Sequence, residues 1–195
     1  MKAGAQFKGD IEKATQFARD SCQRFVSAFI DFPKPLIAAV NGPCYGIMFT
    51  TLGLVDVRIA SDDALFTCPF SSLGISPEGC STYTFPQAFG SSLASELLLL
   101  NYKMPVEEAH RLGFVSRIVP KDKLESYMNE LLYGENGLVK TCYPNSMFNA
   151  KAIIRNEETR LMLHQVNKVE CDLLKQSFTS EECMESLSKF YSRKQ

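Results

Sequence analysis

The sequence has 195 residues, with 21 Lys+Arg against 22 Asp+Glu, a formal net charge of -1 and a hydrophobic fraction of 45%. This length suits one domain, or one domain with a small appendage, and the composition excludes a disordered or low-complexity chain. The near-neutral charge argues against a nucleic-acid-binding protein, because contacts to phosphate backbones require clustered Lys and Arg.

The first half of the chain alternates between helical and extended patterns. Apolar spacing predicts an amphipathic helix from about residue 10 to residue 31, and Pro33 closes it. Residues 35–41 form a continuously apolar segment, typical of a strand buried on both faces of a layered α/β domain. A turn follows at Gly42-Pro43.

Residues 44–54 are predicted to form a helix that is entered through Gly46. Two further strands are expected over residues 55–60 and 64–67, on either side of a polar turn. Strand, glycine turn, helix and strand therefore follow in close succession, which favours an α/β fold.

The segment Ser76-Pro77-Glu78-Gly79 has the chemistry of a helix start, with Ser as the N-cap, Pro at the first helical position and an acid in the first turn. The expected elements after it are helices over 80–88, 92–100 and 105–113, a strand over 115–119, and helices from 121 onward with breaks near 134–137, 143–144 and 177–180.

The sequence does not indicate a disulfide framework, a metal site, a membrane-spanning helix or an S-K-L targeting signal. The seven cysteines form an odd set without a C-x-x-C pair, which favours reduced thiols in an intracellular compartment over a disulfide framework. His110 and His164 lack the spacing of a zinc site, so no metal is expected. No apolar run approaches the ~20 residues of a membrane-spanning helix. The sequence ends Ser-Arg-Lys-Gln, which is not the S-K-L peroxisomal signal.

The segment from Lys34 to Gly46, KPLIAAVNGPCYG, resembles the strand and glycine turn of the enoyl-CoA hydratase/isomerase (crotonase) superfamily. The most specific match is the hexapeptide from Ser76 to Ser81, SPEGCS, which is similar to the Δ3,Δ2-enoyl-CoA isomerase branch found in peroxisomes. The resemblance implies an α/β fold, with a crotonase-like ββα spiral core over 1–120. A C-terminal helical trimerisation region over 121–195 would belong to the same structural domain.

The front of the sequence departs from this pattern. Residues 1–7 do not match the first strands and the G-x-D loop with which complete family members begin, and that loop supplies one of the two oxyanion donors. The resemblance therefore implies a spiral core that lacks the first strands of the family, and it leaves the activity of this shortened chain open.

Two catalytic roles are implied by the resemblance. The backbone N–H of Ile47 would stabilise the thioester enolate, and Glu78 would move a proton from C2 to C4. Hydratases use two glutamates to activate water, but those positions hold Thr50 and Phe70 here, which disfavours hydration. Without the resemblance, Glu78 would be interpreted as an ordinary residue in the first turn of a helix.

Acyl-CoA contacts are also implied by the resemblance. An apolar wall around Glu78 would raise its proton affinity by desolvation. The expected substrate-binding residues are Gly46, Pro69, Phe70, Leu73, Phe190 and Arg193. The alternative for the two phenylalanines is a place in the core, and the alternative for Arg193 is a solvated surface position.

The function implied is conversion of 3-enoyl-CoA to trans-2-enoyl-CoA in fatty-acid β-oxidation. No cofactor is expected, since coenzyme A is part of the substrate. The other expectations are a homotrimer or hexamer, no nucleic-acid or membrane partner, and a peroxisomal or alternatively mitochondrial location. The alternative function is a non-catalytic acyl-CoA-binding or assembly module, as in crotonase domains appended to chromatin proteins.

Overall fold

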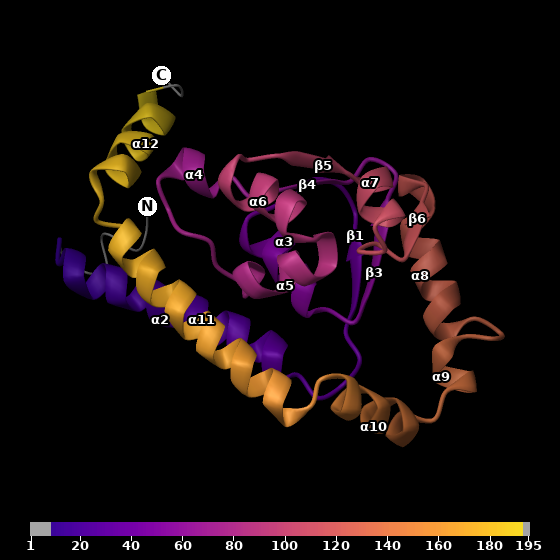
Figure 1. The fold of residues 1–195 in the computed structure, drawn as a ribbon. Coiled ribbons are helices and arrows are strands. Elements are labelled where there is room, and N and C mark those ends of the chain that lie inside the picture. Colours follow the sequence, from indigo (N-terminus) through magenta and orange to yellow (C-terminus); the bar gives the residue numbers. More distant parts are fainter. Residues whose placement is uncertain (1–8, 193–195) are drawn as a thin grey trace.

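Two three-stranded sheets lie in the middle of the fold, and helices surround them (Figure 1). The structure is a computed structural model and describes residues 9–192. In the first sheet, β3 (Val57–Ser61) lies between β1 (Ile37–Val40) and β6 (Arg117–Val119), and both pairings are parallel. In the second sheet, β4 (Leu65–Thr67) pairs in parallel with β2 (Cys44–Tyr45) and antiparallel with β5 (Lys103–Pro105). The α/β fold class is confirmed.

Helices make up most of the rest of the described chain. They are α2 (Ile11–Asp31), α3 (Ile47–Thr50), α4 (Phe70–Leu73), α5 (Ser81–Phe89), α6 (Ser91–Leu99), α7 (Val106–Arg111), α8 (Leu124–Tyr133), α9 (Leu138–Thr141), α10 (Pro144–Ile154), α11 (Glu157–Ser177) and α12 (Glu181–Ser192). Short 3-10 turns occupy Thr51–Leu54 and Lys121–Lys123. Among the described residues, no helix combines the length and apolar character needed to cross a membrane.

The core is centred on buried phenylalanines from separate elements. The ring of Phe49 lies 4.8 Å from that of Phe85 and 5.2 Å from that of Phe66, centroid to centroid. Phe114 meets the Phe49 ring edge-on at 5.8 Å. Because these rings come from α3, β4, α5 and the segment before β6, their packing joins the second sheet to the helices around it.

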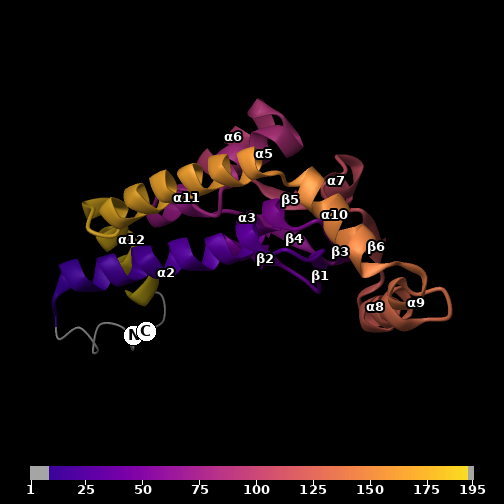
Figure 2. The same ribbon diagram turned by 90° about the horizontal axis from the view of Figure 1, so that it is seen from below.

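The two longest helices, α2 and α11, run side by side in opposite directions (Figures 1 and 2). The predicted helix over residues 10–31 is confirmed, with Asp10 as its N-cap and its end just before Pro33. α12 lies at one end of the molecule and the pair α8 and α9 at the other. The helical layer expected from residue 121 onward is therefore present in the described residues.

Three local predictions are wrong. Residues 44–54 do not form one helix, because Cys44 and Tyr45 pair with β4 before α3 begins at Ile47. β1 is not buried on both faces, since it is an edge strand of its sheet and Ala39 is exposed. The predicted helix start at Ser76 is displaced to Ser81, so Glu78 precedes α5 and is not a first-turn residue.

Replacement of Asn156 by alanine is expected to lower the free energy of unfolding by about 1 kcal/mol. Asn156 is the N-cap of α11, and its Oδ1 accepts a hydrogen bond from the N–H of Thr159 at 2.9 Å. Urea unfolding followed by circular dichroism measures the change. Asn156→Asp retains a capping oxygen and is expected to keep the stability of the parent chain. An equal loss in both variants would contradict a capping role.

Candidate active site

Glu78 is a carboxylate enclosed in the protein interior, in the segment between α4 and α5. Its side chain is 4% exposed, and its Oε1 accepts a hydrogen bond from Thr50 Oγ1 at 3.2 Å. Its Oε2 is buried without a hydrogen-bond partner among the described residues. Burial raises the pKa of Glu78 from 4.5 to about 8, and this desolvation outweighs the Thr50 hydrogen bond, which lowers it. The direction of this shift is the one expected for a carboxylate in an apolar environment.

The backbone on the C-terminal side of Glu78 turns sharply. Gly79 has φ +75° and Cys80 has φ +60°, both in the left-handed region. A Cβ at position 79 would lie 2.3 Å from Thr50 Oγ1, so a side chain there would collide with Thr50. Glycine at 79 thus lets the loop pass close to α3 and brings Glu78 next to the Thr50 hydroxyl.

Thr50 also lies close to the glycine turn that carries Ile47. Its Oγ1 lies 3.2 Å from Ile47 O and 3.3 Å from Gly46 O, so one hydroxyl lies within reach of both this turn and Glu78. Gly46 has φ +53°, and its N–H donates to Thr67 O at 3.0 Å, which ties the turn to β4. Ile47 is the first residue of α3, and an N–H at that position has no acceptor within its own helix.

The structure therefore brings Gly46, Ile47, Thr50 and Glu78 together. Two carboxylates would be needed to activate water in the hydratase manner, and the neighbour of Glu78 here is a threonine hydroxyl. A single carboxylate with a raised pKa can accept a proton and return it to a nearby atom of the same substrate.

The other described residues that were predicted to bind substrate lie on or beside α4 and on α12. Pro69 precedes α4, and Phe70 is buried in the main core. Leu73 on α4 is 40% exposed, and Phe190 on α12 is 52% exposed. Arg193 lies outside the described residues.

α12 packs against α4, so Leu73 and Phe190 belong to neighbouring helices. Their close approach depends on Gly74, which has φ +63°, because a Cβ there would lie 2.6 Å from Cys183 N. Of these two helices, α4 leads into the Glu78 segment through residues 74–77, whereas α12 follows α11 in the chain.

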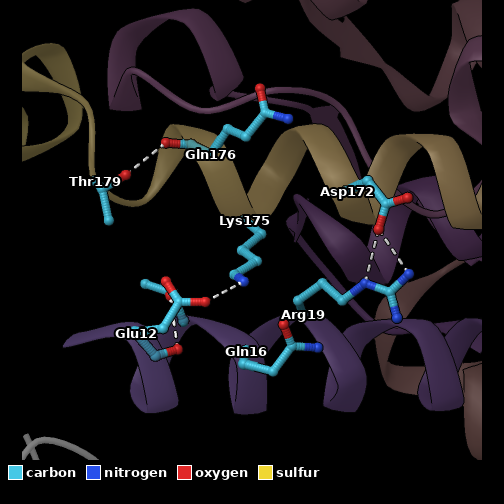
Figure 3. Close-up of a pocket in the computed structure, with 8 residues that line it drawn as sticks. Glu12, Gln16, Arg19, Asp172, Lys175, Gln176 and Thr179 are labelled. Carbon is cyan, nitrogen blue, oxygen red and sulfur yellow. Dashed lines mark hydrogen bonds and ion pairs between the residues drawn. The ribbon is translucent and has the colours of Figure 1, made fainter. Parts of the chain in front are cut away.

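A cavity of about 720 Å³ lies between α2 and α11 (Figure 3). Ion pairs cross it, from Lys175 Nζ to Glu12 Oε1 at 2.6 Å and from Arg19 to Asp172. The residues lining it are Glu12, Thr15, Gln16, Arg19, Asp172, Lys175, Gln176 and Thr179. None of them was predicted as a site residue, and Glu78 does not line this cavity.

Sequence reasoning did not single out Glu170, a buried acid of α11 whose carboxylate accepts hydrogen bonds from Cys80 and Thr82. An acid in the middle of an amphipathic helix carries no local signal of such a role. Its partners are 88 and 90 residues away in sequence.

The chain matches the profile of the family described as Enoyl-CoA hydratase/isomerase over residues 2–195. It is 44% identical over 186 residues to the Enoyl-CoA delta isomerase 2 of Rattus norvegicus, covering 95% of this chain and 46% of the relative. It is 39% identical over 186 residues to the peroxisomal Enoyl-CoA delta isomerase 3 of Mus musculus, covering 95% of this chain and 57% of the relative. The chain thus spans about half the length of these two curated relatives.

Among solved structures, the fold is similar to that of an enoyl-CoA hydratase/isomerase from Pseudoalteromonas atlantica. The two superpose with a TM-score of 0.79 at 30% sequence identity, over 87% of this chain and 66% of the other.

Proposed function

Because this chain belongs to the enoyl-CoA hydratase/isomerase family, we propose that it is a Δ3,Δ2-enoyl-CoA isomerase of fatty-acid β-oxidation, which converts 3-enoyl-CoA to trans-2-enoyl-CoA. The observation that supports this reaction is the state of Glu78, a buried carboxylate whose pKa is raised to about 8 and whose neighbour is a hydroxyl. The identity to two enoyl-CoA delta isomerases supports the same reaction.

In the proposed mechanism, Glu78 accepts the proton that leaves C2 of the acyl chain. The electrons of that C–H bond form the C2=C1 bond of an enolate, and the negative charge moves onto the thioester oxygen. The N–H of Ile47 donates a hydrogen bond to this oxygen, and one such donor typically contributes about 10²–10³ in rate. The enolate then re-forms the thioester, the double bond moves to C2=C3, and Glu78 returns the proton to C4.

The proposed reaction moves one proton and one double bond and causes no net oxidation or reduction. It therefore needs no redox cofactor, and coenzyme A enters as part of the substrate. The proposed substrate contacts are Gly46, Pro69, Phe70, Leu73, Phe190 and Arg193.

We further propose a homotrimer or hexamer and a peroxisomal location. Apolar side chains on the C-terminal helices support association, because Leu161, Val169 and Met184 are each more than half exposed. A peroxisomal relative at 39% identity supports the location.

Conversion of 3-hexenoyl-CoA to the conjugated 2-enoyl product, followed in the ultraviolet, tests the reaction. We expect turnover by the full 195-residue chain and no hydration of crotonyl-CoA. Acyl-CoA binding without turnover would instead support the non-catalytic module, an alternative favoured by the near-complete enclosure of Glu78. Isothermal titration with hexanoyl-CoA, which has no double bond to move, measures the binding.

A further inference from the structure

Glu170 presents a buried carboxylate to the loop that carries Glu78. Its side chain is 3% exposed. Its Oε2 accepts a hydrogen bond from the N–H of Cys80 at 2.7 Å, and its Oε1 accepts from the N–H and the hydroxyl of Thr82 at 2.9 and 2.6 Å. Burial raises the pKa of Glu170, and the hydrogen bonds from Thr82 and Cys80 oppose that rise. Because all three groups are donors, they favour the ionised carboxylate.

These contacts replace the local N-cap that α5 lacks. Cys80 occupies the N-cap position with φ +60°, and its side chain makes no capping hydrogen bond. The first N–H groups of a helix need acceptors, and a negative charge is favourable at that end. The Glu170 carboxylate, which belongs to α11, supplies both the hydrogen-bond acceptor and the negative charge.

The residues that Glu170 contacts are linked to the backbone of Glu78 by a hydrogen bond from Ser81. Ser81 lies between the two residues that Glu170 holds, and its hydroxyl donates to Glu78 O at 2.7 Å. Gly79 fits against Thr50 on the other side of this turn. The position of the Glu78 carboxylate therefore depends on a loop that is fixed at Cys80 and Thr82.

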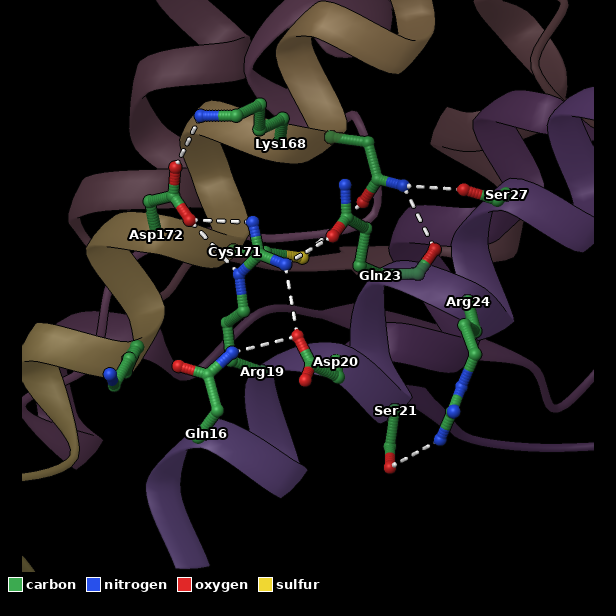
Figure 4. Close-up of polar contacts among 12 residues, drawn as sticks. Gln16, Arg19, Asp20, Ser21, Gln23, Arg24, Ser27, Lys168, Cys171 and Asp172 are labelled. Carbon is green, nitrogen blue, oxygen red and sulfur yellow. Dashed lines mark hydrogen bonds and ion pairs between the residues drawn. The ribbon is translucent and has the colours of Figure 1, made fainter. Parts of the chain in front are cut away.

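Glu170 belongs to a helix that is itself held in place, because polar contacts join α11 to α2 (Figure 4). Arg19 Nε lies 2.9 Å from Asp172 Oδ1, and the terminal guanidinium nitrogen lies 2.6 Å from the same oxygen. Asn167 Nδ2 donates to Gln23 O at 3.0 Å. Glu170 thus lies in sequence between two anchored positions of the helix.

We propose that Glu170 is a positioning residue for Glu78: its carboxylate fixes residues 80–82 and thereby holds the base in place. This rests on the proposed function, in which Glu78 carries the proton. Glu170 acts through the loop and the electrostatic environment of Glu78.

The charge of Glu170 also affects the pKa of Glu78, and that pKa is a second quantity by which the proposal can be tested. Contact with Cys171 and burial raise the pKa of Cys22, and burial raises the pKa of Cys68 and Cys80, so these thiols are neutral at pH 7. The negative charge of Glu170 acts on Glu78 to raise its pKa, and Arg155 brings a positive charge toward Cys80. The groups around Glu78 are Cys22 from α2, Thr50 from α3, Cys68 after β4, Cys80, and Glu170 from α11.

The test compares Glu170→Gln with two matched variants of the full chain. Glutamine has nearly the same shape, but its amide nitrogen cannot accept from Cys80, and the negative charge is removed. Thr82→Val removes one donor and keeps the carboxylate. Glu157→Gln removes an exposed carboxylate from the first turn of the same helix.

For Glu170→Gln we expect a fall in kcat on the order of 10²-fold with KM little changed, because a displaced base slows the chemical step. The pH at which activity rises should move to lower values, since burial still raises the pKa of Glu78 but the added effect of the Glu170 charge is gone. Hydrogen exchange at the amides of Cys80 and Thr82 should become faster. Thr82→Val should lower kcat less and leave the pH profile in place, and Glu157→Gln should leave both kcat and the pH profile unchanged.

The carboxyl titration of Glu78, measured by NMR on glutamate-labelled protein, and the amide exchange do not require turnover. A parent chain without isomerase activity would refute the proposed function, and these two readouts would still test Glu170. Unchanged titration and unchanged exchange in Glu170→Gln would overturn the proposal. If that variant does not fold, equal exchange at Thr82 in the parent and in Thr82→Val would overturn it.

Discussion

Replacement of Glu78 by glutamine is expected to lower the rate of 3-hexenoyl-CoA isomerisation by about 10²–10⁴-fold. Glutamine fills the same buried space and can still accept a hydrogen bond from Thr50, but it cannot take up a proton at neutral pH. The ultraviolet assay on the parent and the variant measures the loss. Hexanoyl-CoA binding should be retained, because the substitution leaves the shape of the site unchanged.

Glu157→Gln is a matched control, since this glutamate is exposed in the first turn of α11. It should retain the parent rate. Activity retained in Glu78→Gln would exclude Glu78 as the base. Loss of both activity and hexanoyl-CoA binding would show that the substitution had altered the site and not only the chemistry.

Glu78 is also expected to make the fold less stable as the pH rises. Its pKa is about 8 in the folded chain against an ordinary value of 4.5, so between these values the folded state holds a proton that the unfolded state releases. The contribution of Glu78 to stability is then greatest below pH 4.5 and falls with increasing pH, by up to about 1.36 kcal/mol per pH unit, until Glu78 ionises in the folded state.

Urea unfolding of the parent and of Glu78→Gln at several pH values measures this effect. Between pH 5 and pH 8, the parent should lose up to about 4 kcal/mol more than the variant, because glutamine does not titrate. Parallel stability curves for the two proteins would contradict the raised pKa. Activity should rise over the same pH range, since only the ionised carboxylate can accept the C2 proton.

The elements that the sequence predicts well are those determined by local patterns. The apolar spacing of residues 10–31 and the following Pro33 correctly predict α2. The apolar runs at β1, β3 and β4 correctly predict strands, because continuous apolar residues in short segments favour a partly buried extended chain. The glycine turn at Gly46 and the choice of Glu78 as a candidate catalytic residue follow from a motif.

Other features depend on contacts between distant segments. β2 has two residues, which is too short for any periodic pattern, and β5 is recognisable only from its pairing with β4. Ser76 and Pro77 have the composition of a helix start, yet α5 begins at Ser81. The acceptor for its first N–H groups is Glu170 of α11, and a distant carboxylate removes the need for a local cap.

The hydrogen bonds between Glu170 and the segment Cys80–Thr82 also bear on the order of events in folding. They join residues 88 and 90 positions apart, and closing such a long loop costs conformational entropy before the contact is formed. The phenylalanine core around Phe49 draws on residues 49–114 and can assemble before α11 is in place. During refolding, the core should therefore form first, and the segment carrying Glu78 should become ordered only when α11 docks.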